Sequence, residues 1–426
     1  MIKVSSAPTG RSVLRGNVDS AGLLTKSGQI IRRGKRPGIA LLVSALSSAG
    51  NFVLTVAVAR SSSVEQMGQY AIAFAVYVLV SGIVRAAVAE SALATPPDGD
   101  DLSTVLGRAH LLTLILAVPV AVVAIALRQP YLGFVALSLP GMVIYEHIRV
   151  MELALGRPKI ALGQECLWTL SSVLVFIAIE HDLALALVGF VIWAFSGSAL
   201  GFLSALLLRV SVHPRWSGGR EEAKTAGLYS LDHVAGTGTA QLNMFAIAAI
   251  GGASVAGALR GAATVFSPLN LVISAARPLA IRKLAVTRRE RPMEELRLGA
   301  LATIGVVLLT LPLALLALLV PDKVGQALLG RTWDVASPLI LPLGLEAVTT
   351  GVSAMAFAGH RAHRAAVRTL VVRLLLAPIR VGVVLTCAAT AGAMGAAWGM
   401  FAVAVLGAVV WWASYWTSAR REGERA

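Results

Sequence analysis

Residues 183–208 read LALALVGFVIWAFSGSALGFLSALLL and contain no charged side chain. An α-helix rises about 1.5 Å per residue, so a run of this length can cross the roughly 30 Å hydrocarbon core of a bilayer. Similar apolar runs recur from Ile39 to Trp416, with short polar loops between them. Because a chain inside a bilayer must satisfy its backbone hydrogen bonds internally, the pattern predicts an all-α, polytopic integral membrane protein.

The apolar runs predict about twelve transmembrane helices. We expect them at 38–59, 68–92, 104–127, 131–153, 160–179, 183–208, 228–250, 253–279, 297–320, 335–358, 367–389 and 393–416. The longest internal polar segment lies near the midpoint, which predicts two six-helix lobes. The expected division is a basic N-terminal arm at 1–37, an N-lobe at 38–209, a linker at 210–226, a C-lobe at 227–417 and a tail at 418–426.

The composition agrees with a membrane location, since 57% of the residues are hydrophobic and 14% are charged. A net charge of +15 would suit a nucleic-acid partner, but the Lys and Arg residues concentrate in alternate loops. This distribution orients membrane proteins, so we expect no nucleic-acid partner and both termini, the linker and the tail in the cytoplasm. The few basic residues expected on the opposite face are Arg60, Arg128, Arg260, Lys323 and Arg331.

The N-terminal arm is polar and basic and contains no apolar segment with a cleavage site, so we expect no cleaved signal peptide. We expect the arm to be disordered. It either contacts anionic lipid headgroups or serves only as a topology signal.

Five arginines fall inside the expected spans. An ionisable side chain in the apolar core is costly and usually faces an interior cavity. The planar guanidinium group donates paired hydrogen bonds to phosphate or pyrophosphate, so we expect a cavity that receives an anionic group from the cytoplasmic side. Alternatively, the four shallower arginines reach the cytoplasmic headgroups, which leaves the deeper Arg380 unexplained. The five residues are Arg85, Arg149, Arg277, Arg373 and Arg380.

Acidic residues also fall in the spans. Glu146 and Glu152 flank Arg149 at helical spacing, which favours neutralisation of that arginine. Asp232, His233 and Glu346 are candidates for carrying a coupling ion, and the first two equally suit the start of a helix. No spacing of His, Cys, Asp or Glu indicates a metal site, and Cys166 and Cys387 read as small core residues.

The sequence contains no Walker A motif, no dinucleotide-binding glycine fingerprint and no nucleophile elbow. We therefore expect no enzymatic activity and no cofactor. Transport would be driven by an ion gradient, by the membrane potential or by the gradient of the substrate itself.

Three stretches, at the expected positions along the chain, resemble one family. The first covers Ser44–Phe52 (SALSSAGNF) with Glu65–Ala71 (EQMGQYA) after it, the second is Ala154–Lys159 (ALGRPK), and the third runs from Leu328 to Leu339 and contains LLGRTW and ASPL. They are similar to the polysaccharide transporters, the O-antigen flippase branch of the multidrug/oligosaccharidyl-lipid/polysaccharide (MOP) exporter superfamily.

The resemblance implies a MATE-like bundle of two lobes that flips a lipid-linked oligosaccharide across the cytoplasmic membrane by alternating access. The cargo would be a sugar chain on polyprenyl pyrophosphate, used for surface polysaccharide synthesis. Membrane lipids and polysaccharide assembly proteins are the other expected partners. A MATE-like multidrug or small-solute antiporter and a membrane glycosyltransferase or polymerase are the alternatives, and a structural scaffold would leave the buried arginines unexplained.

Overall fold

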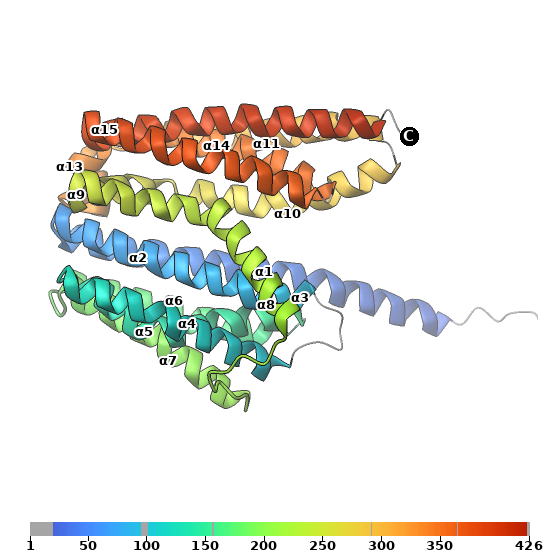
Figure 1. Ribbon diagram of the computed structural model, residues 1–426, viewed down its shortest axis with the longest axis horizontal. Helices are drawn as coiled ribbons and strands as arrows, with labels where there is room; N and C mark the ends of the chain where they lie inside the picture. The colour runs from blue at the N-terminus through green and yellow to red at the C-terminus, as the bar shows by residue number, and fades with distance from the viewer. Residues whose placement is uncertain (1–19, 95–100, 156, 291, 364, 424–426) are drawn as a thin grey trace, which may run out of the picture.

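The computed structural model describes residues 20–94, 101–155, 157–290, 292–363 and 365–423. All regular structure in these residues is helical, and the helices lie roughly parallel in one elongated bundle (Figure 1). The all-α membrane fold expected from the apolar runs is confirmed.

The first lobe contains the helices from α1 to α7. In it α5 packs against α2, α4 and α7, while α1 packs against α6. The long helices are α1 (Ser20–Ser61), α2 (Val64–Arg85), α4 (Leu102–Ala126), α5 (Pro130–Ala154), α6 (Pro158–Glu180) and α7 (Ala186–Leu207); the short η1 (Ala86–Glu90) and α3 (Ser91–Ala94) extend α2.

The second lobe follows a crossing helix, α8 (Arg220–His233), and the short η2 (Val234–Gly238). In it α14 packs against α10, α11 and α15. Its helices are α9 (Thr239–Val265), α10 (Ser267–Glu290), α11 (Pro292–Leu318), α12 (Asp322–Leu329), α13 (Thr332–Ala336), η3 (Ser337–Leu339), α14 (Ile340–Ala362) and α15 (Ala366–Gly423).

The last helix is a hairpin of two antiparallel arms. Its backbone leaves the helical region at Ala391 and Gly392, and Gly392 has φ of 57°. A Cβ on Gly399 would lie 3.1 Å from Cβ of Cys387, and Arg368 Nε donates a hydrogen bond to Ser414 Oγ, so the two arms pack side by side. The break falls at the loop expected between spans eleven and twelve.

Ten segments of the described chain are long and apolar enough to cross a membrane. One of them, Val367–Arg420, contains the α15 hairpin and therefore crosses twice. The strongly basic α10 is not among the ten, but it runs beside α11 and α14 along the bundle (Figure 1). The described helices thus agree with the expectation of about twelve spans in two lobes.

The turn between the seventh and eighth spans lies at Phe266. The expected spans 228–250 and 253–279 had predicted this turn at Gly251–Gly252, and that prediction is wrong. Gly252 has φ of 82° and only kinks α9. A Cβ on Gly238 would contact Leu79 and one on Gly257 would contact Val64, so α9 continues along α2 past the kink. Glycine allows positive φ in a kink as readily as in a turn, and the sequence does not distinguish the two.

The basic N-terminal arm is helical from Ser20, where α1 begins. The expectation of a disordered arm is therefore wrong for residues 20–37, and residues 1–19 lie outside the described chain. Extending an existing helix costs far less than nucleating one, so the apolar span propagates its helix outward. Figure 1 shows this part of α1 projecting beyond the bundle.

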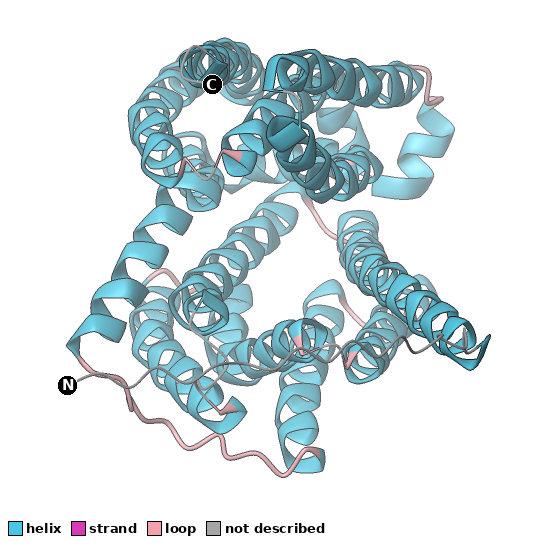
Figure 2. Ribbon diagram, turned by 90° about the vertical axis from the view of Figure 1, so that its right-hand side faces the viewer, coloured by secondary structure: helices cyan, strands magenta, loops and turns pink. Residues whose placement is uncertain are grey.

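The two lobes meet along α2 and α9, and α8 crosses between them at one end of the bundle. We call this the α8 end; α1 extends beyond it, and α15 ends there. The opposite end, where α12 contacts the last turn of α1, is the α12 end. Viewed from the α8 end, the helices form two groups (Figure 2).

Candidate functional site

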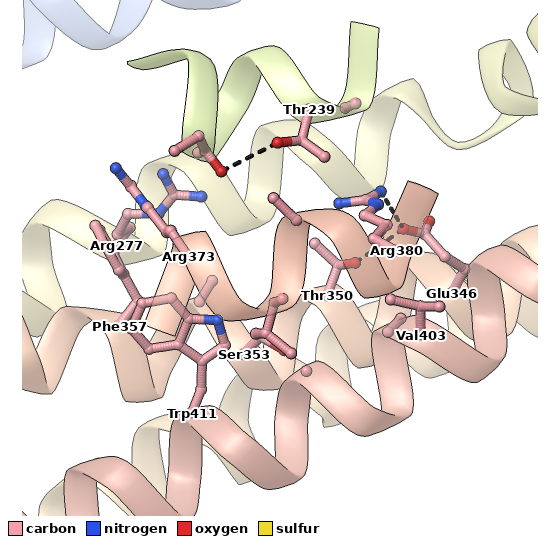
Figure 3. A pocket seen from close by; sticks show the side chains of 18 residues that line it. Thr239, Arg277, Glu346, Thr350, Ser353, Phe357, Arg373, Arg380, Val403 and Trp411 are labelled. Atoms are coloured by element: carbon pink, nitrogen blue, oxygen red, sulfur yellow. Dashed lines mark hydrogen bonds and ion pairs between the residues drawn. The ribbon is translucent and has the colours of Figure 1, made fainter. Parts of the chain in front are cut away.

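A cavity of about 330 Å³ lies within the C-lobe, between η2, α9, α10, α14 and α15 (Figure 3). A volume of this size is typical of a small-molecule site. The lining residues include three of the five predicted arginines and one of the predicted acids, Arg277, Arg373, Arg380 and Glu346.

One face of α14 forms a wall of the cavity. Glu346, Thr350, Ser353 and Phe357 all line it. Their spacing of four, three and four residues places them in one stripe along the helix, since an α-helix has 3.6 residues per turn. This stripe combines a carboxylate, two hydroxyl groups and an aromatic ring.

The arginines reach the cavity from two helices. Arg373 and Arg380 are seven residues apart on the first arm of α15, so they lie on the same face two turns apart. Arg277 enters from α10, beside Arg373 in Figure 3.

The three arginines differ in their ion pairs. Arg373 Nη1 lies 2.8 Å from Asp232 Oδ2, and Arg380 Nη2 lies 3.9 Å from Glu346 Oε1. Arg277 has no carboxylate partner among the residues that the structure describes. Glu346 is the one carboxylate among the described residues of the lining, so the cavity carries a net positive charge and attracts anions.

Phe357 lies among the guanidinium groups. The Cζ atoms of Arg373, Arg361 and Arg277 are 4.9, 5.1 and 6.0 Å from its ring centroid, which is within the range of cation–π attraction. Trp411 meets the same ring edge to face at 5.5 Å. The ring therefore helps to hold several cations close together, although they repel each other.

Gly236 in η2 lets the backbone approach Arg373. A Cβ at this position would lie 2.7 Å from Arg373 Cζ, which is closer than real Cβ contacts. The glycine therefore leaves the space in which the guanidinium group rests.

Arg85 and Arg149 lie in the N-lobe, outside this cavity. Arg149 contacts Glu146 and Glu165, each at 2.5 Å, and Arg85 lies 3.2 Å from Glu146 and 3.7 Å from Glu90. The structure therefore does not bring the five arginines into one cavity. The carboxylates of Glu90, Glu146 and Glu165 compensate the charges of these two arginines. Glu165 lies on α6 beside α5, so helical spacing within the sequence could not reveal its contact with Arg149.

The expected partner Glu152 does not contact Arg149. Its nearest cation among the described residues is Arg157, at 3.9 Å. Neutralisation of Arg149 was expected, and the structure shows that Glu146 and Glu165 provide it.

Asp232 and His233 occupy the last turn of α8, before the span that begins at Thr239. Asp232 binds Arg373, while the ring of His233 packs so closely against α2 that a Cβ on Gly82 would lie 2.2 Å from Nε2. Burial, together with the nearby guanidinium groups of Arg85 and Arg373, lowers the pKa of His233.

Sequence reasoning expected Arg260 on the face opposite the basic loops, within the span 253–279, and did not predict its contact with an aromatic ring. Arg260 lies within α9, and its Cζ is 4.4 Å from the ring centroid of Phe74 on α2. Sequence reasoning also missed the α14 stripe, although its four-three-four spacing is visible in the sequence.

Comparisons with known proteins agree with this fold. A family model described as "Polysaccharide biosynthesis protein" matches residues 57–338. No curated protein sequence matches the chain significantly.

Several solved structures are similar in fold. The inward-facing conformation of a multidrug resistance MATE transporter of the MOP superfamily has a TM-score of 0.69 and 15% identity, over 89% of this chain and 96% of that one. The lipid II flippase MurJ, in an inward closed conformation, has a TM-score of 0.64 and 10% identity, over 88% and 86%. A MOP superfamily transporter from Pyrococcus furiosus, described as having a binding pocket of reverse polarity, has a TM-score of 0.52 and 15% identity, over 91% of this chain and 95% of that one.

Proposed function

The chain belongs to the polysaccharide biosynthesis protein family, and we propose that, as a flippase or exporter of this family, it moves a lipid-linked oligosaccharide across the cytoplasmic membrane. The headgroup is an anionic phosphate or pyrophosphate, and alternating access of the two lobes carries it across. The MurJ structure, which is named a lipid II flippase, supports a lipid-linked cargo on the same fold.

One observation carries the proposal: Arg277, Arg373 and Arg380 meet in a single cavity that holds one carboxylate among its described lining residues. Pyrophosphate offers several oxygen acceptors and multiple negative charges, which match the paired donors of guanidinium groups. Arg277 has no carboxylate partner among the described residues, so it is available to the ligand without first breaking an ion pair.

The cavity volume of about 330 Å³ suits a headgroup with its nearest sugar and is too small for a long saccharide and a polyprenyl tail. We therefore assign the tail to the bilayer and the outer sugars to the space between the lobes. The hydroxyl groups of Thr350 and Ser353 and the ring of Trp411 supply polar and stacking contacts for the first sugar.

The membrane orientation follows from charge. Lys and Arg concentrate in the loops of the α8 end, so we propose that this end and both termini face the cytoplasm of the inner membrane. The cavity is lined by η2 and the start of α9 near this end, which supports loading of the headgroup from the cytoplasm. Assembly proteins of the polysaccharide pathway are the proposed partners on the other side.

The predicted coupling residues have a different proposed role. Asp232 and Glu346 act as counter-ions of Arg373 and Arg380 while the cavity is empty. His233 packs against Gly82 of the N-lobe and joins the lobes at the α8 end.

Flipping in proteoliposomes tests the function. Purified protein is reconstituted with a fluorescent polyprenyl-pyrophosphate oligosaccharide, and the fraction that reaches the opposite leaflet is measured. We expect Arg277→Ala and Arg380→Ala to lower the flipping rate about tenfold or more, since each removes a charge-assisted contact. Arg277→Lys keeps the charge but loses the paired donors, so it retains partial activity.

The matched control is Arg128→Ala, which removes an exposed arginine in the loop after α4. Wild-type flipping by both cavity variants would refute the cationic-headgroup mechanism. Transport of cationic drugs without flipping would instead support the MATE-like antiporter, which the positive cavity disfavours.

A further inference from the structure

Asp232 occupies a position that an anionic ligand would also take. Its Oδ2 lies 2.8 Å from Arg373 Nη1, and its backbone carbonyl oxygen accepts a second hydrogen bond from the same nitrogen at 3.3 Å. A further cation, Arg361, is 3.9 Å from Oδ2. A carboxylate between two guanidinium groups that also flank Phe357 resembles a phosphate ligand in charge and in acceptor geometry.

The side chain is carried by a connecting element. Asp232 lies in the last turn of α8, which contacts η1 and α2 of the N-lobe and leads through η2 into α9 of the C-lobe. Arg373 belongs to the first arm of α15, inside the C-lobe cavity. The ion pair thus ties the crossing helix to the cavity wall.

A phosphate group that enters the cavity competes with Asp232 for Arg373. Phosphate has more negative charge and more acceptor oxygens than one carboxylate, so it gains more from the guanidinium donors. The two anions also repel each other, which favours departure of the carboxylate.

We propose that Asp232 is an internal substitute for the headgroup, which holds α8 on the C-lobe until a phosphate or pyrophosphate displaces it from Arg373. This inference rests on the proposed function, because it assigns a positioning role within the same cavity. Binding of a ligand in the cavity would thereby break the Asp232–Arg373 ion pair and release α8, the helix that joins the lobes. Asp232 thereby sets both the affinity for the headgroup and the position of α8.

The first test is a binding titration in nanodiscs. Inorganic pyrophosphate and farnesyl pyrophosphate are titrated separately into wild-type protein, Asp232→Asn and Asp232→Glu. Asp232→Asn removes the competing charge and keeps the side-chain volume, so we expect the dissociation constant to fall roughly tenfold for both probes. Asp232→Glu restores the competing carboxylate and returns the constant toward the wild-type value.

Comparison of the two probes identifies the source of the anion. Tighter binding of farnesyl pyrophosphate than of inorganic pyrophosphate indicates a lipid headgroup, and equal binding indicates a free phosphate compound. The control is Asp182→Asn, an exposed carboxylate in the loop between α6 and α7, which we expect to bind both probes as wild type does.

The second test measures the position of α8. Spin labels are placed at Leu231→Cys on α8 and Leu406→Cys on the second arm of α15, both exposed positions, in a chain whose Cys166 and Cys387 are replaced by serine. Pulsed electron paramagnetic resonance gives the distance between them. We expect pyrophosphate to change this distance in wild type, and Asp232→Asn to show the changed distance without any ligand.

The outcomes separate the two proposals. If wild type binds neither probe, the proposed headgroup recognition is wrong. If wild type binds but Asp232→Asn has the same or a weaker affinity, or if the α8 distance does not respond to pyrophosphate, the exchange is wrong while the proposed function stands.

Discussion

Single residues decide which intramembrane arginines are available to a ligand. Arg149 contacts two carboxylates, whereas Arg277 has no carboxylate partner among the described residues. An arginine that lines a cavity without a carboxylate partner can donate its hydrogen bonds to an anionic ligand, as proposed above for the headgroup. Depth in the membrane did not distinguish the two residues, because the difference lies in their neighbours.

His233 provides a pH prediction at this scale. Burial and two nearby guanidinium groups lower its pKa below the ordinary value of about 6.5, so the folded protein keeps the ring neutral. As the pH falls below about 6.5 toward the lower folded-state pKa, the unfolded chain gains a proton that the folded protein does not bind. The free energy of unfolding therefore decreases with falling pH over this window.

Thermal unfolding in nanodiscs measures this effect. We expect the Tm of wild type to fall between about pH 7 and pH 5 by more than that of His233→Gln, which cannot titrate there. Identical pH profiles for the two proteins would show that the ring is not held neutral.

Helix pairs set the conformation of the molecule. The main contact between the lobes is α2 against α9, and it is closest at two glycines toward the α12 end. A Cβ on Gly68 would lie 1.7 Å from the carbonyl oxygen of Ala253, and one on Gly257 would lie 2.3 Å from that of Val64. Small residues allow two helix backbones to approach this closely, so the glycines close this end of the bundle.

Gly68→Ala is expected to separate the lobes at the α12 end. Overpacking of this kind costs about 1–3 kcal/mol, which shifts a conformational equilibrium about fivefold or more. The probe is Thr332→Cys, a buried position that hydrogen-bonds to the carbonyl of Ala59 at this end, in a chain otherwise free of cysteine. We expect an impermeant maleimide to label it faster in Gly68→Ala.

Gly305→Ala is the matched control, since a Cβ there meets no atom within 4 Å. We expect it to leave the labelling rate unchanged. Equal rates in all three proteins would exclude the glycine contact as the closure of this end.

At the scale of the whole molecule, the distribution of charge predicts the orientation. The α8 end carries most of the basic loops, so we expect it in the cytoplasm. Exposed positions in two loops test this: Ser217→Cys precedes α8, and Asp182→Cys lies in the loop between α6 and α7. In intact cells, an impermeant maleimide should label Asp182→Cys and leave Ser217→Cys unmodified.

Disrupted cells are the control, because both cysteines should then react. Labelling of Ser217→Cys alone in intact cells would reverse the proposed orientation and place the cavity entrance outside.

The sequence by itself determined the fold class, the approximate number of spans and the presence of arginines in the apolar core. Hydrophobic length and the cost of burying charge are local properties, so they can be read from runs such as 183–208 and from Arg380. The turn at Phe266 escaped this reading, because a glycine pair suits a kink and a turn equally. The contact of Arg260 with Phe74 depends on the packing of α9 against α2. Only the tertiary structure decided which charges meet, since ion pairs such as Arg373 with Asp232 join residues far apart along the chain through the packing of separate helices.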